Sequence, residues 1–155
     1  MMKRLLLILV CGIFASNAYA SGLSEQELKA KATQFLQAKE AKQQPSTTEA
    51  DIDHFLSFFS DEFTDEHVKF NVTVTDKNEF KQGLMGKMQD EIAYNKIEIG
   101  EMLIGANVVA VKFTENGKVK PSHLNKFIEY SVPHIMVMEF DEKGLIKHLR
   151  RHHGK

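Results

Sequence analysis

Met-Glu-Phe-Asp-Glu-Lys-Gly-Leu-Ile, at residues 138–146, has the form of two apolar segments joined by a polar turn. Asp and Gly are favoured in turns, so the chain is expected to reverse direction at 141–144. The segment before the turn, 127–140, and the segment after it, 145 to about 152, are then predicted strands. Pro133 interrupts the first strand. Because proline cannot donate a hydrogen bond to a neighbouring strand, we expect an edge, a bend or a bulge there.

Strand patterns also dominate the chain upstream of this hairpin. Nearly everything from Tyr94 onward is predicted to be strand, including 108–113, and Asn116-Gly117 is a tight-turn signal. Further upstream, four apolar residues alternate with polar ones over 68–74. This period of two predicts a half-buried strand, which the polar stretch 61–66 precedes as a turn.

Three helices are predicted ahead of most of these strands. Residues 24–27, Ser-Glu-Gln-Glu, form a capping box that opens a helix to about Gln44. A weaker cap at 48–51 opens a short helix with an aromatic face, and 76–79 begin a third helix. The apolar positions that mark the three helices are Leu28, Ala32, Phe35 and Leu36; Ile52, Phe55, Leu56 and Phe59; and Phe80, Leu84, Met88 and Ile92. Helices at one end of the chain and strands at the other are typical of the α+β class.

Two stretches of the sequence resemble the nuclear transport factor 2-like superfamily, whose members include ketosteroid isomerase and SnoaL-like polyketide cyclases. Residues 55–62, Phe-Leu-Ser-Phe-Phe-Ser-Asp-Glu, are similar to a helix of that family that ends in phenylalanine and an acidic pair. Residues 138–146 are similar to its hairpin with the pattern apolar-x-Phe-Asp-x-x-Gly-x-Ile. In element order the resemblance covers nearly all of 21–150. It implies an α+β, cone-like fold of about three N-terminal helices packed on a curved, mostly antiparallel sheet.

The same resemblance implies a ligand pocket in the mouth of the cone. In ketosteroid isomerase the general base follows the second helix, while a tyrosine and a protonated carboxylic acid bind the oxyanion. The matching positions here are Glu66 or His67 for the base, Phe35 for the tyrosine and Met136 for the acid. Phe35 and Met136 cannot donate a hydrogen bond, so the isomerase reaction is disfavoured. The stretch of the last strand that corresponds to the aspartate of SnoaL-like cyclases is 149–152, and it contains no carboxylate.

Glu66 and His67 are candidates for acid–base catalysis. Regular alternation would place Glu66 on the apolar face with Val68 and Phe70, and His67 on the polar face. A carboxyl group at the rim of an apolar pocket has a raised pKa, because burial disfavours its charge, and it could then move a proton. The alternative for Glu66 is a solvated acid in a turn.

His134 is the third candidate acid or base. Counting by twos places it with Met136, Met138 and Phe140 on the inward side of the predicted strand. Histidine titrates near neutral pH and could bind or protonate a ligand there. The alternative is a core histidine held by a backbone carbonyl.

Apolar side chains and one cation are the candidate ligand contacts. The candidate apolar contacts are Phe35, Phe59, Met136 and Met138. Methionine fills cores as readily as it lines pockets, so packing alone is the alternative for these positions. Arg151 is a candidate partner for a ligand carboxylate or for Glu66, because its planar guanidinium matches a carboxylate. The alternative for Arg151 is an exposed basic tail.

No metal site and no cofactor are predicted. His148, His152 and His153 lie close together in sequence, but they lack an acidic or cysteine partner at ligand spacing. The sequence contains no glycine-rich phosphate loop, no Gly-x-Ser-x-Gly and no His-Glu-x-x-His.

Residues 1–20 have the features of a secretory signal peptide. Two basic residues precede an apolar run at 5–14, and Ala18-Tyr19-Ala20 is a small-x-small cleavage site. The run is too short to span a bilayer. We therefore expect one mature domain, 21–155, in the periplasm or secreted, with no membrane segment. The single cysteine, Cys11, falls within the signal, so the mature chain would have no disulfide or thiol site. Lipidation of Cys11 is the alternative.

The charge balance bears on the choice of partners. Without its two signal-peptide bases the chain carries 18 basic and 21 acidic side chains, a net charge of −3. This balance does not indicate nucleic-acid binding. Three functions stay open. The first is binding of a small apolar or weakly acidic molecule in the pocket. The second is isomerase, cyclase or hydratase chemistry that uses Glu66, His67 or His134. The third is an interaction module that forms a homodimer through the outer face of its sheet.

Overall fold

The structure, a computed structural model, describes residues 22–154, so the predicted signal peptide lies outside the described residues. Three helices pack on six strands, whose order in the sheet is β2-β1-β6-β5-β4-β3. The elements are α1 (Glu25–Ala41), α2 (Glu49–Leu56), β1 (Phe59–His67), the 3₁₀ turn η1 (Val68–Phe70), β2 (Val72–Val74), α3 (Lys77–Lys87), β3 (Glu91–Gly105), β4 (Val108–Lys120), β5 (Ile128–Phe140) and β6 (Ile146–His153).

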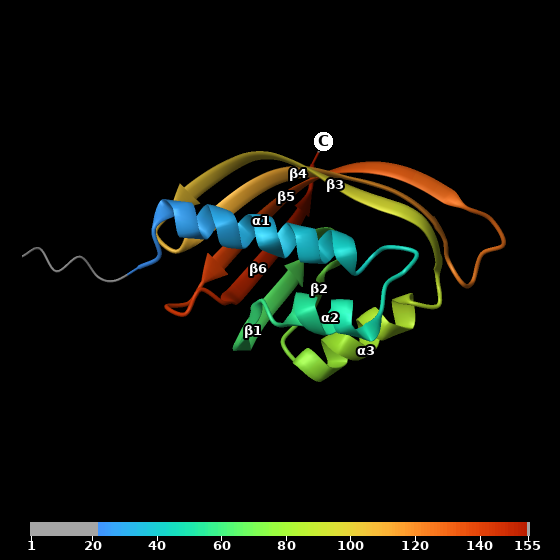
Figure 1. Ribbon diagram of the computed structural model, residues 1–155, viewed down its shortest axis with the longest axis horizontal. Coiled ribbons are helices and arrows are strands. Elements are labelled where there is room, and N and C mark those ends of the chain that lie inside the picture. The colour runs from blue at the N-terminus through green and yellow to red at the C-terminus, as the bar shows by residue number, and fades with distance from the viewer. Residues whose placement is uncertain (1–21, 155) are drawn as a thin grey trace, which may run out of the picture.

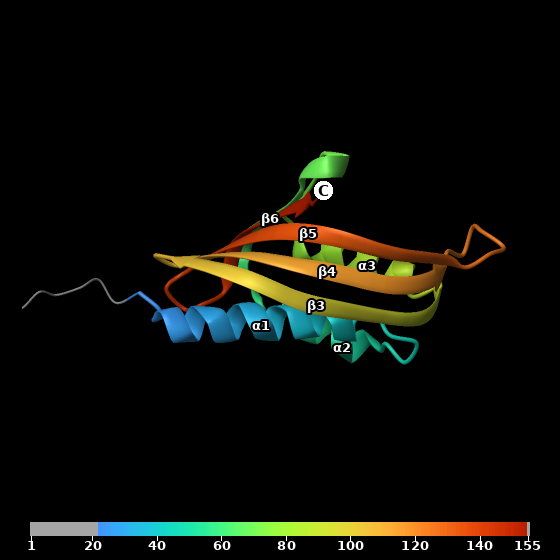
Figure 2. The ribbon, with the colours of Figure 1, turned by 90° about the horizontal axis from the view of Figure 1, so that it is seen from above.

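The prediction of an α+β cone is confirmed. The long strands β3, β4 and β5 arch over the molecule, and α1 lies along the sheet beneath them (Figure 1). Seen from above, α1 and α2 lie on one side of these strands and η1 projects on the other (Figure 2). All neighbouring strands are antiparallel except β1 and β6, which run parallel. Within the described part of the chain, no helix is long and apolar enough to cross a membrane.

The helix starts follow the predicted caps. Ser24 Oγ accepts a hydrogen bond from the Glu27 amide, and the Glu27 carboxylate accepts one from the Ser24 amide, which completes the capping box. The ends differ from expectation, since α1 stops at Ala41, α2 at Leu56 and α3 at Lys87. Apolar residues placed on the predicted helices, such as Phe59 and Ile92, instead begin the strands that follow.

The largest correction concerns 61–74. We expected a turn at 61–66 and a strand from 68, but the strand is β1, at Phe59–His67, and 68–70 form the 3₁₀ turn η1. The acidic residues of β1 can lie in a strand because β6 pairs with β1 in parallel and places its arginines beside them. In this register Asp65 lies opposite Leu149, and Glu66 lies opposite Arg150. Arginines of β6 pair with the acids of β1 on both faces of the sheet, so the polarity of 61–66 does not by itself predict a turn.

A second correction concerns Asn116-Gly117, which is not a turn. Both residues lie inside β4, and the β3–β4 reversal falls at Ala106-Asn107, where Asn107 adopts a φ of 55°. Gly117 has a packing role instead. A Cβ atom at this position would lie 2.5 Å from Cζ and Oη of Tyr130 on β5. The missing side chain therefore lets the Tyr130 ring cross β4.

The hairpin at 138–146 has the predicted form. Asp141 Oδ1 accepts hydrogen bonds from the Lys143 and Leu145 amides, at 2.9 and 2.8 Å. Gly144 has a φ of 74°, a conformation that glycine adopts without strain. Pro133 lies where β5 passes the end of β6. The Pro133 carbonyl accepts a hydrogen bond from the Gly154 amide, just past the end of β6. The nitrogen and the carbonyl of one strand residue point to the same side, so the Pro133 nitrogen also faces the region beyond the end of β6. The missing donor is tolerated at this partial edge.

The core lies between the helices and the concave side of the sheet. Phenylalanines from α1, α2 and β1 pack edge to face, with Phe35 and Phe59 ring centroids 5.6 Å apart. Met138 and Phe140 on β5 cover the same interior from the sheet. Burying side chains of this size supplies roughly 1.5–3 kcal/mol each, which makes this cluster the main stabilising unit.

Candidate functional site

A cavity of about 480 Å³ opens between the helices and the concave face of the sheet. Its walls are mainly apolar and include Phe35 of α1, Phe55 of α2 and Phe80 of α3. Sheet residues such as Met136 and Val132 close the opposite side. A concave, mostly apolar space with a few convergent polar groups is the usual form of a small-molecule site.

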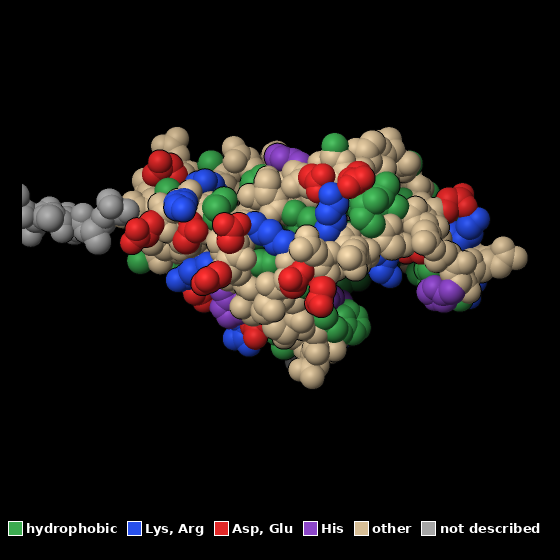
Figure 3. Space-filling view, turned by 90° about the horizontal axis from the view of Figure 1, so that it is seen from below, with side chains coloured by type: hydrophobic (Ala, Val, Ile, Leu, Met, Phe, Trp, Pro, Cys, Tyr) green, Lys and Arg blue, Asp and Glu red, His purple; other side chains and the backbone are tan. Residues whose placement is uncertain are grey.

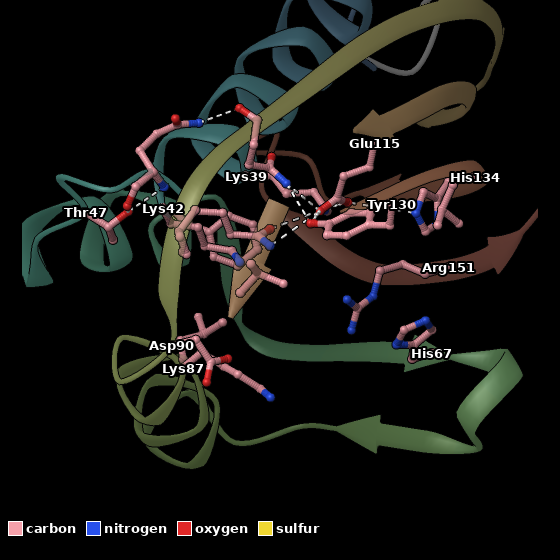
Figure 4. Close-up of a pocket in the computed structure, with 18 of the residues that line it drawn as sticks. Lys39, Lys42, Thr47, His67, Lys87, Asp90, Glu115, Tyr130, His134 and Arg151 are labelled. Carbon is pink, nitrogen blue, oxygen red and sulfur yellow. Dashed lines mark hydrogen bonds and ion pairs between the residues drawn. The ribbon is translucent and has the colours of Figure 1, made fainter. Parts of the chain in front are cut away.

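The first polar group in the cavity is a network around Glu115 of β4. Lys39 of α1 forms a buried ion pair with Glu115, and Asn95 Nδ2 donates to Glu115 Oε1 at 3.0 Å (Figure 4). Tyr130 Oη lies 3.1 Å from the same Asn95 amide. Lys39, Asn95 and Glu115 are all less than a tenth exposed. Asn95 Oδ1 has no partner among the residues of 22–154, and it is the buried polar atom that a ligand or water would satisfy.

Burial and pairing set the charge of this network. Burial alone would raise the pKa of Glu115, but the Lys39 ammonium and the Asn95 amide outweigh it and hold that pKa at about 2. Burial lowers the pKa of Lys39, while Glu115 opposes the change. The two groups form a closed ion pair, so neither has a free charge to offer a ligand.

The second polar group joins β1 to β6. Arg151 donates from Nε to Asp65 Oδ1 at 3.0 Å and from Nη2 to Oδ2 at 2.8 Å, a bidentate pair. The Asp65 residue is 1% exposed. Burial raises the pKa of Asp65, and Arg151 opposes this. Arg151 therefore lines the cavity, and its carboxylate partner is Asp65 rather than Glu66.

Three histidines gather beside this pair. His67 Nε2 and His153 Nε2 lie 3.1 Å apart, so one ring donates to the other. The His134 ring stacks on Phe113 at 4.9 Å and stands edge to face with His153. Burial, followed by the charge of Arg151, lowers the pKa of His67 to about 4. Burial also lowers the pKa of His134 to about 4, with Glu115 opposing it. Both rings are neutral at pH 7.

These pKa values predict how stability depends on pH. A histidine that is neutral in the fold and has a pKa near 6.5 when unfolded stabilises the fold above pH 6.5, and the contribution is lost as the pH falls toward 4. We expect the free energy of unfolding to decrease over that range. In His134→Gln the decrease should be smaller by on the order of 1 kcal/mol. Urea unfolding followed by circular dichroism at several pH values measures this effect.

The matched control for this experiment is His123→Gln, because His123 is exposed in the β4–β5 connection. Its removal should leave the slope of stability against pH unchanged. If His134→Gln leaves that slope unchanged too, His134 is not held neutral in the folded protein.

The structure brings some of the predicted site residues together and separates others. Five line the cavity, namely Phe35, His67, His134, Met136 and Arg151. Phe59 and Met138 are fully buried in the adjoining core and do not line it. Glu66 lies on the opposite face of β1, where His148 and Arg150 hold it. Regular alternation counted from 68–74 would put Glu66 inward and His67 outward, but β1 ends at His67 and the 3₁₀ turn η1 follows, so that count does not apply.

Several residues of the site were missed in the sequence, although two of them carried a usable signal. Glu115 continues the inward series of Val109, Val111 and Phe113 on β4, and Lys39 lies four residues after Phe35 on α1. A charged residue at a position where the helix or strand pattern calls for an apolar one indicates a buried ionic group. Asp65 and Asn95 gave no such sign, because β1 was not recognised and β3 contains bulges.

No cluster within residues 22–154 combines three or more His, Cys, Asp or Glu side chains in positions to hold a metal ion. The three cavity histidines contact one another and their aromatic neighbours instead.

Solved structures of other proteins share this arrangement of helices and sheet. A SnoaL-like polyketide cyclase protein from Shewanella denitrificans superposes with a TM-score of 0.67 at 11% identity, over 82% of this chain and 90% of that one. This chain has the nuclear transport factor 2-like fold. A second SnoaL-like polyketide cyclase protein, from Shewanella putrefaciens, shares the fold with a TM-score of 0.66 at 14% identity, over 99% of this chain and 92% of the other.

A third structural neighbour is SalBIII, an epoxide hydrolase/cyclase-like enzyme with a role in pyran ring formation in the polyether salinomycin. It superposes with a TM-score of 0.62 at 16% identity, over 84% of this chain and 93% of that one. No family model matches the sequence, and no curated protein matches it either. Identities this low establish the fold, while activity has to be argued from the site itself.

Proposed function

We propose that this protein is an exported binding protein that holds a small apolar or weakly acidic molecule in the cone cavity. The observation that carries the proposal is the division of the cavity into apolar walls and a polar floor whose buried acids are already paired. Glu115 is neutralised by Lys39, and Asp65 by Arg151. Such a floor can orient a ligand without having a strong base free to react with it.

Charge in the cavity favours a weakly acidic ligand over a basic one. Four basic side chains, Lys39, Lys42, Lys87 and Arg151, line the cavity together with three acids, Asp65, Asp90 and Glu115. The lining therefore carries an excess of positive charge whenever Lys42 is protonated, and a bound anion would favour that form of Lys42. A carboxylic acid, phenol or enol would be stabilised as its anion there, because an opposite charge nearby favours the charged form.

Native mass spectrometry tests the proposal on protein purified from the exported fraction of the cells that produce it. We expect extra mass on the folded protein that disappears on denaturation. Val132→Trp should abolish this mass, because Val132 lines the cavity and an indole would occupy part of it. Ser131→Trp is the control, since Ser131 is the exposed neighbour on β5. Equal retained mass in both variants would place the ligand outside the cavity, against the proposal.

A proton-transfer enzyme of the isomerase, cyclase or hydratase type is the second candidate, and the shared position of His67 and His134 favours it. Both rings line the cavity beside Arg151 and are neutral, as a general base must be. Glu66 does not face this space, so the histidines would do the chemistry. Deuterium uptake from heavy water into the recovered ligand, lost in His134→Gln, would favour the enzyme over the binding protein.

A homodimer is part of the same proposal. Leu103 and Ile135 are 66% and 39% exposed. Leu103 pairs with Ala110, and Ile135 with Lys112, so both lie among the outward-facing positions of the sheet. The native mass measurement reads the oligomeric state together with the ligand.

A further inference from the structure

Two lysines at the C-terminal end of α1 line the cavity and differ in what holds them. Lys39 lies in the last turn of the helix, and Lys42 is the residue at its C-cap, three positions later. Lys39 is engaged by Glu115. Lys42 Nζ has no ion pair or hydrogen bond with any residue of 22–154, and it lies 4.8 Å from the centroid of the Phe55 ring. Both side chains are labelled in Figure 4.

The pairing of charges leaves Lys42 without an acid. Glu115 is taken by Lys39 and Asp65 by Arg151, in both cases with the hydrogen bonds described above. Asp90, at the α3 end of the cavity, accepts from the Ser122 amide. A Lys42 ammonium would therefore add uncompensated positive charge to a space that already holds Lys39 and Arg151.

An amine in these surroundings favours its neutral form. Burial, followed by the nearby Lys39 charge, lowers the pKa of Lys42 to about 7, while Glu115 and Asp65 oppose the change. At neutral pH a large share of Lys42 then carries a free lone pair. A lysine that is desolvated in an apolar pocket or placed next to another cation is an activated nucleophile toward carbonyl groups.

We propose that Lys42 is a reactive amine that holds aldehydes or ketones with an apolar body in the cavity as an imine. This inference rests on the proposed function, because it names a ligand class for the same cavity. The Nζ lone pair adds to the carbonyl carbon, and the π pair moves to oxygen. A proton passes from nitrogen to oxygen and gives a carbinolamine. A second proton, taken from solvent, lets the oxygen leave as water while the nitrogen lone pair forms the C=N bond, and the nitrogen then returns one proton to solvent. One amine and one carbonyl give one imine and one water, with no change in oxidation state.

Neighbouring groups make Lys42, rather than another lysine, the site. The Lys39 nitrogen forms an ion pair with the Glu115 carboxylate, which favours its protonated form. Lys87 also borders the cavity, but its side chain is exposed to solvent at the end of α3. The Phe55 ring below Lys42 offers an apolar surface for the body of a carbonyl compound.

Reductive trapping tests the inference. Cinnamaldehyde, an apolar aldehyde, and formaldehyde, which has no apolar body, are each mixed with the folded protein at pH 7 and sodium cyanoborohydride. The reductant converts an imine into a stable secondary amine, and peptide mass mapping locates it. With cinnamaldehyde we expect Lys42 to be modified about tenfold faster than Lys87, or more, because a large share of Lys42 carries a free lone pair at this pH. Lys42→Arg should remove this label, and Lys87→Arg should leave it in place.

The outcomes separate this inference from the proposed function. If Lys42 reacts no faster than Lys87 with either aldehyde, the reactive amine is wrong, while retained ligand in native mass spectrometry still supports the binding protein. If formaldehyde but not cinnamaldehyde selects Lys42, the cavity does not admit an apolar body, and both proposals fail. Thermal unfolding of Lys42→Arg by circular dichroism shows whether that variant keeps the fold. If it does not, the rate ratio of Lys42 to Lys87 in the unaltered protein decides.

Discussion

Glu115→Leu is expected to lower the free energy of unfolding by about 3–5 kcal/mol, because removing one partner of a buried ion pair leaves the other charge without compensation. The charge left without a partner is that of Lys39, which is 8% exposed. Asn95 would also lose the carboxylate that accepts from its amide. Urea unfolding followed by far-ultraviolet circular dichroism measures the loss, and the midpoint should fall with little change in slope.

An exposed ion pair on the same sheet provides the control. Glu91 and Lys120 pair across β3 and β4, with side chains 58% and 34% exposed. Surface pairs contribute about 0–1 kcal/mol, so Glu91→Leu should cost little. The double variant Lys39→Met with Glu115→Leu should recover most of the loss of the single one, since apolar residues of similar size replace a buried pair at little cost. If the single and double variants lose equally, the buried charge is not the cause.

The parts of the fold that were predictable rest on short-range signals. The capping box at 24–27 and the polar turn at 141–144 act through neighbouring residues, so the sequence alone reveals them. Counting by twos along β5 also placed His134 and Met136 correctly on the inner side. Each of these features needs only the few residues that surround it.

The parts of the fold that were predicted wrongly depend on contacts between segments far apart in the sequence. Strand β1 was mistaken for a turn because its acids are stabilised by arginines more than 80 positions later. Asn116-Gly117 resembled a turn, although glycine is required there by the Tyr130 ring on β5. No local pattern contains either fact. The candidate site was therefore half predictable, in its strand β5 residues but not in its acids.

Asp65→Leu is expected to cost about 3–5 kcal/mol of unfolding free energy, and Glu66→Leu about 1 kcal/mol or less. The two acids are adjacent on β1 and pair with the adjacent arginines Arg151 and Arg150 of β6. Their ion-pair distances are similar, 2.8 Å for Asp65 and 2.6 Å for Glu66. The Asp65 side chain is 0% exposed and that of Glu66 is 30% exposed. Comparison of the two variants by urea unfolding therefore isolates burial as the cause.

The same comparison carries a functional consequence. Without Asp65, the Arg151 guanidinium is unpaired in the cavity and adds an uncompensated positive charge there. An anionic ligand should then be retained more strongly by Asp65→Leu than by Glu66→Leu, since Arg150 lies on the other face of the sheet. The double variant Asp65→Leu with Arg151→Met should return both stability and retention toward the starting values. If the two single variants behave alike, water reaches the inner ion pair as freely as the outer one, and the floor of the cavity is not the desolvated surface that the proposed ligand binding requires.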